Sequence, residues 1–80
     1  MKIVSVKHVK KYQLIVTFSD QTKKKVDLAN FLKTAINPMT VKFRDLKLFS
    51  KVKITHGHLS WGDSEMDLSA SDLYDWKNDE

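Results

Sequence analysis

A large apolar residue at every second position near the amino terminus limits what this chain can fold into. Four large apolar residues occupy every second position from Tyr12 to Phe18, and Gln13, Ile15 and Thr17 stand between them. Successive side chains of a β-strand point to opposite faces, so this pattern predicts a strand with one buried face. Because the backbone groups of a strand need hydrogen-bonding partners, the first third of the chain is expected to form a sheet.

The segments on either side supply the partner strands. Residues 3–9 are rich in Val and Ile, and residues 23–28 alternate again toward their end. The dipeptide at 10–11 and the polar residues at 19–22 suit short connections. We therefore predict a three-stranded antiparallel meander with one apolar face.

The middle of the chain changes to helical spacing. Apolar residues between 29 and 36 fall on one face of a helix that ends before Pro38, because a proline disfavours helical geometry in the residue preceding it. Thr40 is then in place to cap a second short helix. The residues expected to face the core from these two helices are Phe31, Leu32, Ala35, Ile36, Phe43, Leu46 and Phe49.

The last third of the chain predicts a hairpin and a capped helix. Residues 52–55 and 58–61 have strand patterns, and His56-Gly57 between them suits a tight turn in which glycine adopts a positive φ. Ser69 is followed three residues later by an acid, as in a capping box at the start of a helix. The docking groups of that helix are Leu73, Tyr74 and Trp76, and residues 77–80 are expected to fray.

Together these elements predict an α+β fold. We expect one small domain over residues 1–80, in which a three-stranded N-terminal meander and a C-terminal hairpin form antiparallel sheet, with short helices packed on one face. The chain has 80 residues, no Cys and 2 Gly. These numbers exclude a two-domain enzyme, a disulfide framework, thiol chemistry and a glycine-rich phosphate loop. No apolar run approaches the roughly 18 residues that span a bilayer, so we expect a cytoplasmic protein without a membrane partner.

Charge is distributed unevenly along the chain. Residues 1–55 contain 13 of the 14 basic residues and three acids, a net charge of +10, whereas residues 56–80 have a net charge of −6. A basic half can bind a polyanion, but 13 of the 14 basic residues are lysines, which lack the bidentate fork of arginine. A solvated surface that protects sheet edges is the simpler interpretation. A polyanion or partner surface would consist of Lys10, Lys11, Lys23, Lys24, Lys25 and Arg44.

The histidines and acids near the carboxyl terminus are weak candidates for chemistry. His56 and His58 are two residues apart, but no further ligands stand at the spacing of a metal site. The acids Asp63, Glu65 and Asp67 lack the glycine and the distal acid of an EF-hand loop, and Asp67 is expected to brace backbone amides where the chain turns. An enzyme that uses His58 with Asp63 or Asp67 is the least favoured alternative. We expect no catalytic residue, metal, cofactor or small-molecule substrate.

The order of several of these elements resembles a known family. The residues that carry the resemblance are Tyr12-x-Leu14-x-Val16-x-Phe18-x-Asp20, Val26-Asp27-Leu28, Trp61, Asp67-Leu68-Ser69 and Leu73-Tyr74. Over nearly the whole chain they are similar to the small bacterial family called domain of unknown function 2442. The chain departs from the family pattern in its first turn, where Gln21 stands and a glycine is missing. The resemblance implies a compact α+β fold and no established enzyme activity.

The resemblance also implies a partner. Some members of the family are fused to a helix-turn-helix domain, and others are encoded beside a second small protein in arrangements that look like toxin and antitoxin pairs. This chain looks like the stand-alone form. The leading hypothesis is therefore a non-enzymatic, antitoxin-like interaction module that binds another small protein through a sheet edge or its charge-polarised surface, with Ile15 as a candidate contact. The alternative is a nucleic-acid-binding or transcription-regulatory accessory protein that uses the lysine-rich N-terminal half.

Overall fold

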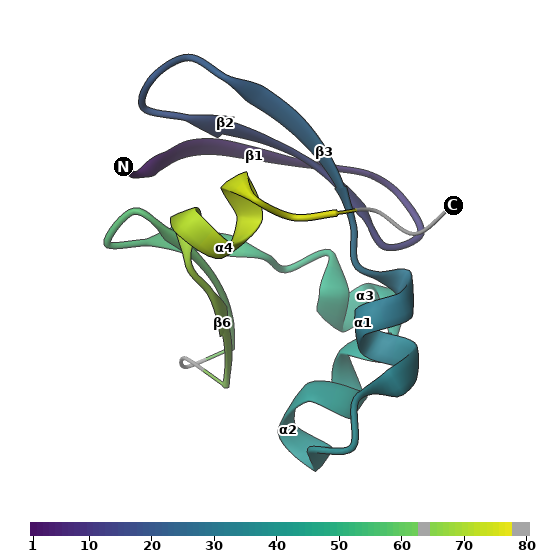
Figure 1. Ribbon diagram of the computed structural model, residues 1–80. Coiled ribbons are helices and arrows are strands. Elements are labelled where there is room, and N and C mark those ends of the chain that lie inside the picture. The colour runs from purple at the N-terminus through teal and green to yellow at the C-terminus, as the bar shows by residue number, and fades with distance from the viewer. Residues whose placement is uncertain (63–64, 78–80) are drawn as a thin grey trace.

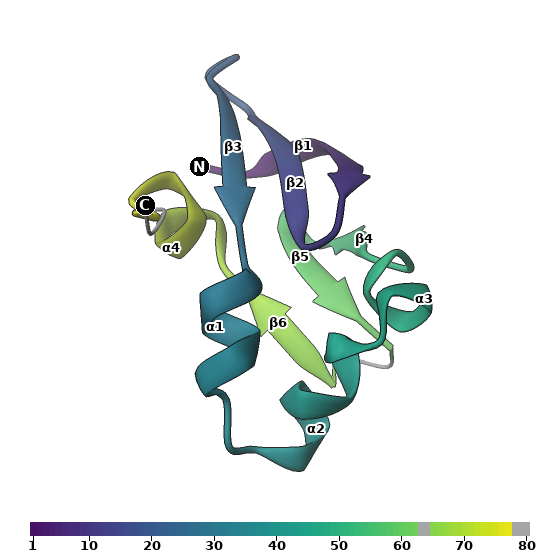
Figure 2. The ribbon, with the colours of Figure 1, turned by 90° about the vertical axis from the view of Figure 1, so that its right-hand side faces the viewer.

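The computed structural model describes residues 1–62 and 65–77 and contains two three-stranded sheets with short helices beside them (Figure 1). The elements in chain order are β1 (Ile3–Lys10), β2 (Gln13–Phe18), β3 (Lys23–Asp27), α1 (Ala29–Thr34), α2 (Pro38–Val41), the 3-10 helix η1 (Lys42–Arg44), α3 (Leu46–Phe49), β4 (Lys53–Thr55), β5 (His58–Trp61), β6 (Met66–Leu68) and α4 (Ala70–Tyr74). The first sheet lies over the second (Figure 2), and α1, α2 and α3 gather at one end (Figure 1). The α+β fold class predicted from the sequence is confirmed.

The predicted meander is the first sheet. Its strand order is β1-β2-β3, and both neighbouring pairs are antiparallel. Leu14, Val16 and Phe18 on the central strand are completely buried, whereas Gln13 and Ile15 between them are half-buried. The alternation in the sequence thus places one face of this sheet on the core and the other toward solvent.

The predicted C-terminal hairpin carries a third strand. His56 and Gly57 have φ angles of 52° and 82°, as a two-residue turn with both residues in the left-handed region requires. Beyond the hairpin, β6 pairs with β5, so that Met66 lies opposite Trp61. The prediction that Asp67 braces amides at a turn is wrong, because Asp67 lies in the middle of β6 with an exposed side chain.

α1 is shorter than the helical spacing predicts. It ends at Thr34, and Ala35 is extended, with φ −65° and ψ 140°. Ile36, which the spacing places in the core, is 94% exposed, so that prediction is wrong. Arg44 gives a physical reason for the early end, because its guanidinium donates to three main-chain carbonyls in the last residues of α1 and just beyond it.

Pro38 begins a helix instead of ending one. It is the first residue of α2, where its missing N–H costs no hydrogen bond. Asn37 caps this helix, since its Oδ1 accepts a backbone N–H two residues further on at 2.9 Å. The prediction of a cap at Thr40 is therefore wrong. Asp45 caps α3 in the same way, and the first residue of that helix, Leu46, is 43% exposed instead of buried as predicted.

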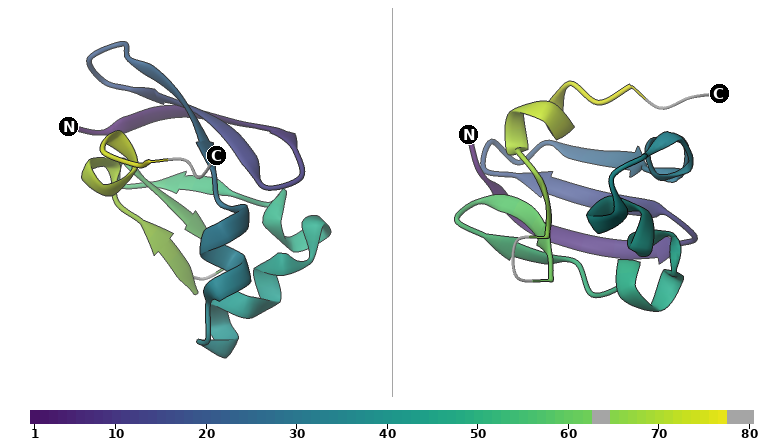
Figure 3. Two further views of the ribbon diagram at one scale, coloured as in Figure 1. Left: turned by 45° about the vertical axis from the view of Figure 1, so that its right-hand side comes forward. Right: turned by 90° about the horizontal axis from the view of Figure 1, so that it is seen from below.

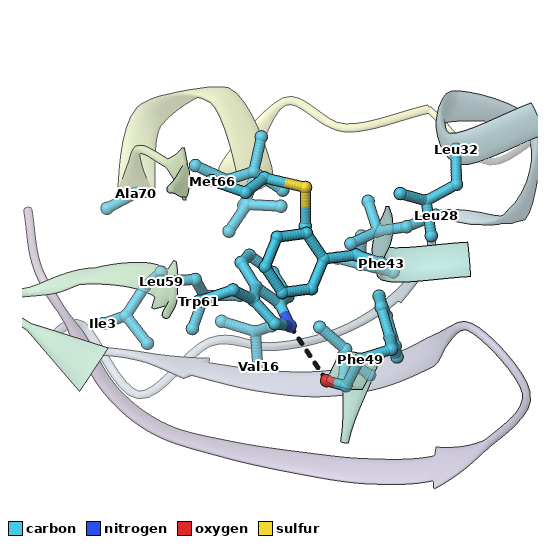
Figure 4. Packing of buried hydrophobic residues seen from close by; sticks show 14 of the residues in the cluster. Ile3, Val16, Leu28, Leu32, Phe43, Phe49, Leu59, Trp61, Met66 and Ala70 are labelled. Atoms are coloured by element: carbon cyan, nitrogen blue, oxygen red, sulfur yellow. Dashed lines mark hydrogen bonds between the residues drawn. The ribbon is translucent and has the colours of Figure 1, made fainter. Parts of the chain in front are cut away.

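The core lies between the two sheets and is centred on Trp61 (Figure 4). The indole N–H of Trp61 donates to the carbonyl oxygen of Phe49 at 2.8 Å, and both side chains are completely buried. The Phe49 ring also meets the rings of His8 and Tyr12 edge to face, each at a centroid distance of 5.3 Å. Phe49 thus connects the first sheet to Trp61 on the second.

The predicted cap of the last helix is confirmed. The hydroxyl of Ser69 accepts the backbone N–H of Asp72 at 3.2 Å, and Leu73 on α4 is completely buried. The structure describes Lys77 but not residues 78–80, so the predicted fraying there lies outside the described residues.

α4 docks beside β3 (Figure 3). The Tyr74 ring meets Phe18 edge to face at 5.0 Å, and its hydroxyl donates to the carboxylate of Asp20 at 3.1 Å. The indole N–H of Trp76 donates to the carbonyl oxygen of Asp27 at 3.3 Å. These contacts hold the acidic end of the chain against the basic first sheet, on the side that faces the core.

Trp61 gives the first stability prediction. We expect Trp61→Ala to lower the free energy of unfolding by about 3 to 5 kcal/mol, the usual cost of removing a buried aromatic side chain. Trp61→Phe keeps most of the apolar volume and removes one of the two donors to the Phe49 carbonyl, which still accepts the N–H of Val52 at 3.3 Å, so the expected cost is about 0.5 to 1.5 kcal/mol. Urea denaturation followed by circular dichroism measures both. A loss below about 1 kcal/mol for the alanine variant would contradict this account of the core.

Gln21 gives a second prediction, because it occupies a position that favours glycine. Its φ is 73°, in the turn between β2 and β3, and its N–H donates to the Phe18 carbonyl at 2.9 Å. A residue with a β-carbon costs roughly 1 to 2 kcal/mol in the left-handed region of backbone conformation, and glycine removes this strain. The larger entropy of glycine in the unfolded chain offsets roughly 0.5 to 1 kcal/mol of that stabilisation. Gln21→Gly should therefore raise the free energy of unfolding by about 0.5 to 1 kcal/mol. Gln21→Ala, which keeps the β-carbon, is the control and should give no such gain; equal effects of the two variants would refute the strain argument.

Candidate interaction surface

The outer face of the first sheet is the most distinctive surface of the molecule. The register places Lys7, Ile15 and Lys25 in one row across the three strands. The neighbouring row runs from Ser5 through Thr17 to Lys23. We call this surface the lysine face and define it by Lys7, Ile15, Thr17, Lys23 and Lys25. Within the described residues, the second sheet and all the helices lie on the opposite side of the first sheet (Figure 1).

The sequence prediction of a basic surface included four residues at or near this face. Lys23 and Lys25 lie on it, while Lys10 and Lys11 lie at the turn between β1 and β2. Because β2 and β3 are antiparallel, this turn lies at the opposite end of the sheet from Lys23. The positive charge is therefore spread along the sheet rather than concentrated in one cluster.

Lys24 takes part in the fold. It is paired with buried Val16 on the inner side of the sheet, and its ammonium group donates to the main-chain carbonyl of Tyr74 at 2.6 Å. Lys24 thus links α4 to β3, whereas Lys23 and Lys25 on either side of it lie on the lysine face. The alternation of side chains along a strand explains the difference.

Arg44 stands apart from the lysines altogether. Its Nε donates to the Leu32 carbonyl at 2.7 Å, and its Nη2 donates to those of Lys33 at 2.8 Å and Ala35 at 3.2 Å. Carbonyls at the end of a helix lack some of their helical donors, and here that of Leu32 also accepts a backbone hydrogen bond, from the N–H of Ala35 at 3.4 Å. In addition, the hydroxyl of Tyr12 donates to the carbonyl of Arg44 itself. Arg44 therefore fixes the end of α1, away from the lysine face.

The residues that carried the family resemblance have mainly structural positions. Trp61, Leu68 and Leu73 are buried, and Ser69 caps α4. Tyr74 is 36% exposed, with its hydroxyl on Asp20. These residues hold β5, β6 and α4 together and lie away from the lysine face, whereas Asp67 points to solvent.

Among the described residues, the structure brings together one pair of the candidate chemical groups, His58 and Asp67. His56 lies in a turn, while His58 on β5 has its Nε2 3.8 Å from an oxygen of Asp67, both side chains being partly exposed. Glu65 forms an ion pair with Lys42, and Asp63 lies outside the described residues. Within residues 1–62 and 65–77 no three His, Cys, Asp or Glu side chains are grouped to hold a metal ion. No helix of that same part of the chain is long and apolar enough to cross a membrane.

Two features of the surface were missed in the sequence. Lys7 lies on the lysine face, and the alternation in β1 could have revealed it, since Lys7 is opposite Ile15. An open pocket of about 210 Å³ lies where α1 leaves the first sheet. It is lined by Tyr12, Ala29, Leu32, Lys33 and Arg44. No local pattern could have revealed it, because three separate elements meet there.

The structure therefore defines a small α+β domain in which two three-stranded sheets enclose one aromatic core and leave a basic outer face. A family model described as "Protein of unknown function (DUF2442)" matches residues 3–79, and the chain belongs to this family. The resemblance stated from the sequence is thereby confirmed over nearly the full length. Neither a curated protein nor a solved structure gives a significant match.

Asp20 gives a pH prediction for the turn at the end of the lysine face. The pKa of its carboxyl lies below the ordinary value of 3.8, first because the backbone and side chain of Thr22 donate to it, and in smaller part because the hydroxyl of Tyr74 does. A lowered folded-state pKa means that this contribution to stability is complete above the unfolded pKa and is lost as the pH falls through the folded pKa. Tyr74→Phe should move the pKa of Asp20 toward 3.8 without reaching it, as measured by an NMR titration of the carboxyl carbon. An unchanged pKa in the variant would contradict the contact.

Proposed function

We propose that this protein is a non-enzymatic interaction module that binds an acidic region of a second small protein through the lysine face. The observation that carries the proposal is that this face is basic and lies outside the enclosed core. The antitoxin-like role that the family resemblance implies belongs to the same proposal, with the second protein as the partner.

The arrangement of the acidic segment supports this proposal. Asp72 lies on α4 and Asp75 directly follows it, and the helix is held on the inner side of β3 by the hydrogen bond from Lys24 to the Tyr74 carbonyl. Glu65 is paired with Lys42, outside the lysine face. Of the acids in the last third of the chain that the structure describes, Glu65, Asp72 and Asp75 therefore lie away from the lysine face, on which Lys7 and Lys23 are exposed. Complementary charge of this kind raises the rate of association and makes binding sensitive to salt.

The sheet edges are less suitable for the partner than the face. β1 has irregularities near both ends, between Ile3 and Ser5 and between His8 and Lys10, and bulges protect an edge from pairing. On β3, Trp76 donates to the carbonyl of Asp27. We therefore favour side-chain contacts with the face over the addition of a partner strand.

The alternative function, nucleic-acid binding, has support from the same lysines, because they follow the strands of one exposed surface. Two observations favour a protein partner. Arg44, which has the only guanidinium, is held at the end of α1, and Tyr12 and Phe18 point to the core rather than to the outer face, where bases would stack.

The experiment compares two charge-matched variants expressed in the native host. The first variant combines Lys7→Glu and Lys23→Glu and so changes the lysine face. The control combines Lys47→Glu in α3 and Lys51→Glu just after that helix, and it changes the net charge by the same amount. Each protein is purified at low ionic strength, with and without nuclease, and examined by native mass spectrometry. We expect the wild type and the control to retain one stoichiometric small protein, and the face variant to lose at least about tenfold of it.

Two results would contradict the proposal. Equal retention of the partner by both variants would show that the lysine face does not bind it. Loss of the bound mass after nuclease treatment would favour the alternative, and the affinity should then fall steeply with salt concentration. Thermal unfolding of both variants checks that the comparison is between folded proteins.

A further inference from the structure

The open pocket beside α1 has walls and charges that suit a particular kind of ligand. Its volume is about 210 Å³, and Leu32 and Tyr12 provide buried and half-buried apolar surface. Ala29 forms part of its wall without filling it. A closed cavity of about 150 Å³ is enough to hold a benzene molecule, so this pocket has room for a group of five or six carbon atoms.

Arg44 in this pocket is fixed before any ligand arrives. Its Nε and Nη2 donate to the three carbonyls at the end of α1, at 2.7 to 3.2 Å. Within the part of the chain that the structure describes, the other terminal nitrogen, Nη1, donates to no protein acceptor. Two N–H groups of an immobilised guanidinium are therefore left for a ligand, and little side-chain entropy remains to be lost on binding.

The charged side chains that line the pocket have one sign. Lys33 and Arg44 line it, and its other lining residues are Tyr12, Ala29 and Leu32, none of which is an acid. A guanidinium beside an apolar wall recognises a carboxylate attached to an apolar group, because the carboxylate accepts charge-assisted hydrogen bonds while the apolar part leaves water.

We propose that this pocket binds a carboxylate carried by a small apolar group, with Arg44 and Lys33 contacting the carboxylate and Tyr12 and Leu32 contacting the apolar part. A free short-chain carboxylic acid and the carboxyl-terminal residue of a peptide share this chemistry. The pocket shares no lining residue with the lysine face. Failure of the proposed function would therefore leave this inference standing, and failure here would leave the proposed function standing.

The first experiment is an NMR titration of the whole protein with hexanoate and with hexanamide, its uncharged counterpart. We expect hexanoate to shift the signals of Ala29, Leu32, Lys33 and Arg44 and to bind at least about tenfold more tightly than hexanamide, because hydrogen bonds to charged groups are roughly twice as strong as neutral ones. Equal binding of the two compounds, or shifts that avoid these residues, would overturn the proposal. So would the absence of any shift at about 20 mM hexanoate, since a ligand of this size should bind with a millimolar constant.

Two pairs of variants test the walls and the charge of the pocket without disturbing Arg44. Ala29→Leu fills the pocket, whereas Asn30→Leu places the same side chain at the next position of α1, which does not line it. Lys33→Gln removes a lining cation, whereas Lys47→Gln removes one on α3. We expect loss of hexanoate binding in Ala29→Leu, several-fold weaker binding in Lys33→Gln, and unchanged binding in both controls. Unchanged binding in Ala29→Leu would place the ligand elsewhere and overturn the proposal.

A third titration distinguishes the two sources of the carboxylate. The ligands are a tetrapeptide that ends in leucine with a free carboxyl group and the same peptide with a terminal amide. Binding of the free peptide at least about tenfold more tightly than hexanoate, with loss on amidation, assigns the pocket to a protein terminus. Tighter binding of hexanoate assigns it to a small acid. Equal binding of the free and amidated peptides, together with equal binding of hexanoate and hexanamide, excludes both.

Discussion

The fold depends on the contact between Trp61 and Phe49. Trp61 is the largest completely buried side chain, and its indole N–H would be costly to bury without the Phe49 carbonyl that accepts it. Phe49 in turn carries ring contacts to His8 and Tyr12 on the first sheet. The strands of the second sheet are only three or four residues long, at the short end of the usual range. This contact therefore joins the two small sheets into one core. It also holds α3 in place, because Phe49, the last residue of that helix, contacts both sheets.

The remaining parts of the structure follow from that core. With the inner faces of both sheets joined, the chain needs only short helices and caps to close the ends, and Arg44 and Lys24 are used for this purpose. Two of the six basic residues that the sequence offers as a binding surface are thereby engaged in the fold. The lysine face is left outside the core, with its charge spread over three strands. The surface proposed for binding therefore depends on the fold as well as on the run of lysines in the sequence, because the fold uses Lys24 and Arg44 for internal contacts.

The predictable and unpredictable parts of the structure differ in the kind of information they need. The alternation around Leu14 and Val16, the His56-Gly57 turn and the Ser69 cap are local patterns, and each is found where the sequence places it. Ile36 and Leu46 were misplaced because helical spacing reports a face but not whether other elements cover it. β6 is only three residues long, too short for a pattern, and its place depends on pairing with β5. The pocket and the role of Arg44 arise from contacts between distant segments, which no local pattern contains.

The measurement that tests this account most directly is hydrogen exchange of the Trp61 indole N–H, followed by NMR together with the backbone amides of β2 and β5. If one core unites the two sheets, the indole and the slowest amides of both sheets should exchange only through global unfolding and give the same free energy of opening. An indole that opens with a free energy well below that of β2 would contradict the account. The second sheet would then unfold separately from the first, and the contact between Trp61 and Phe49 would not unite the two sheets in one core.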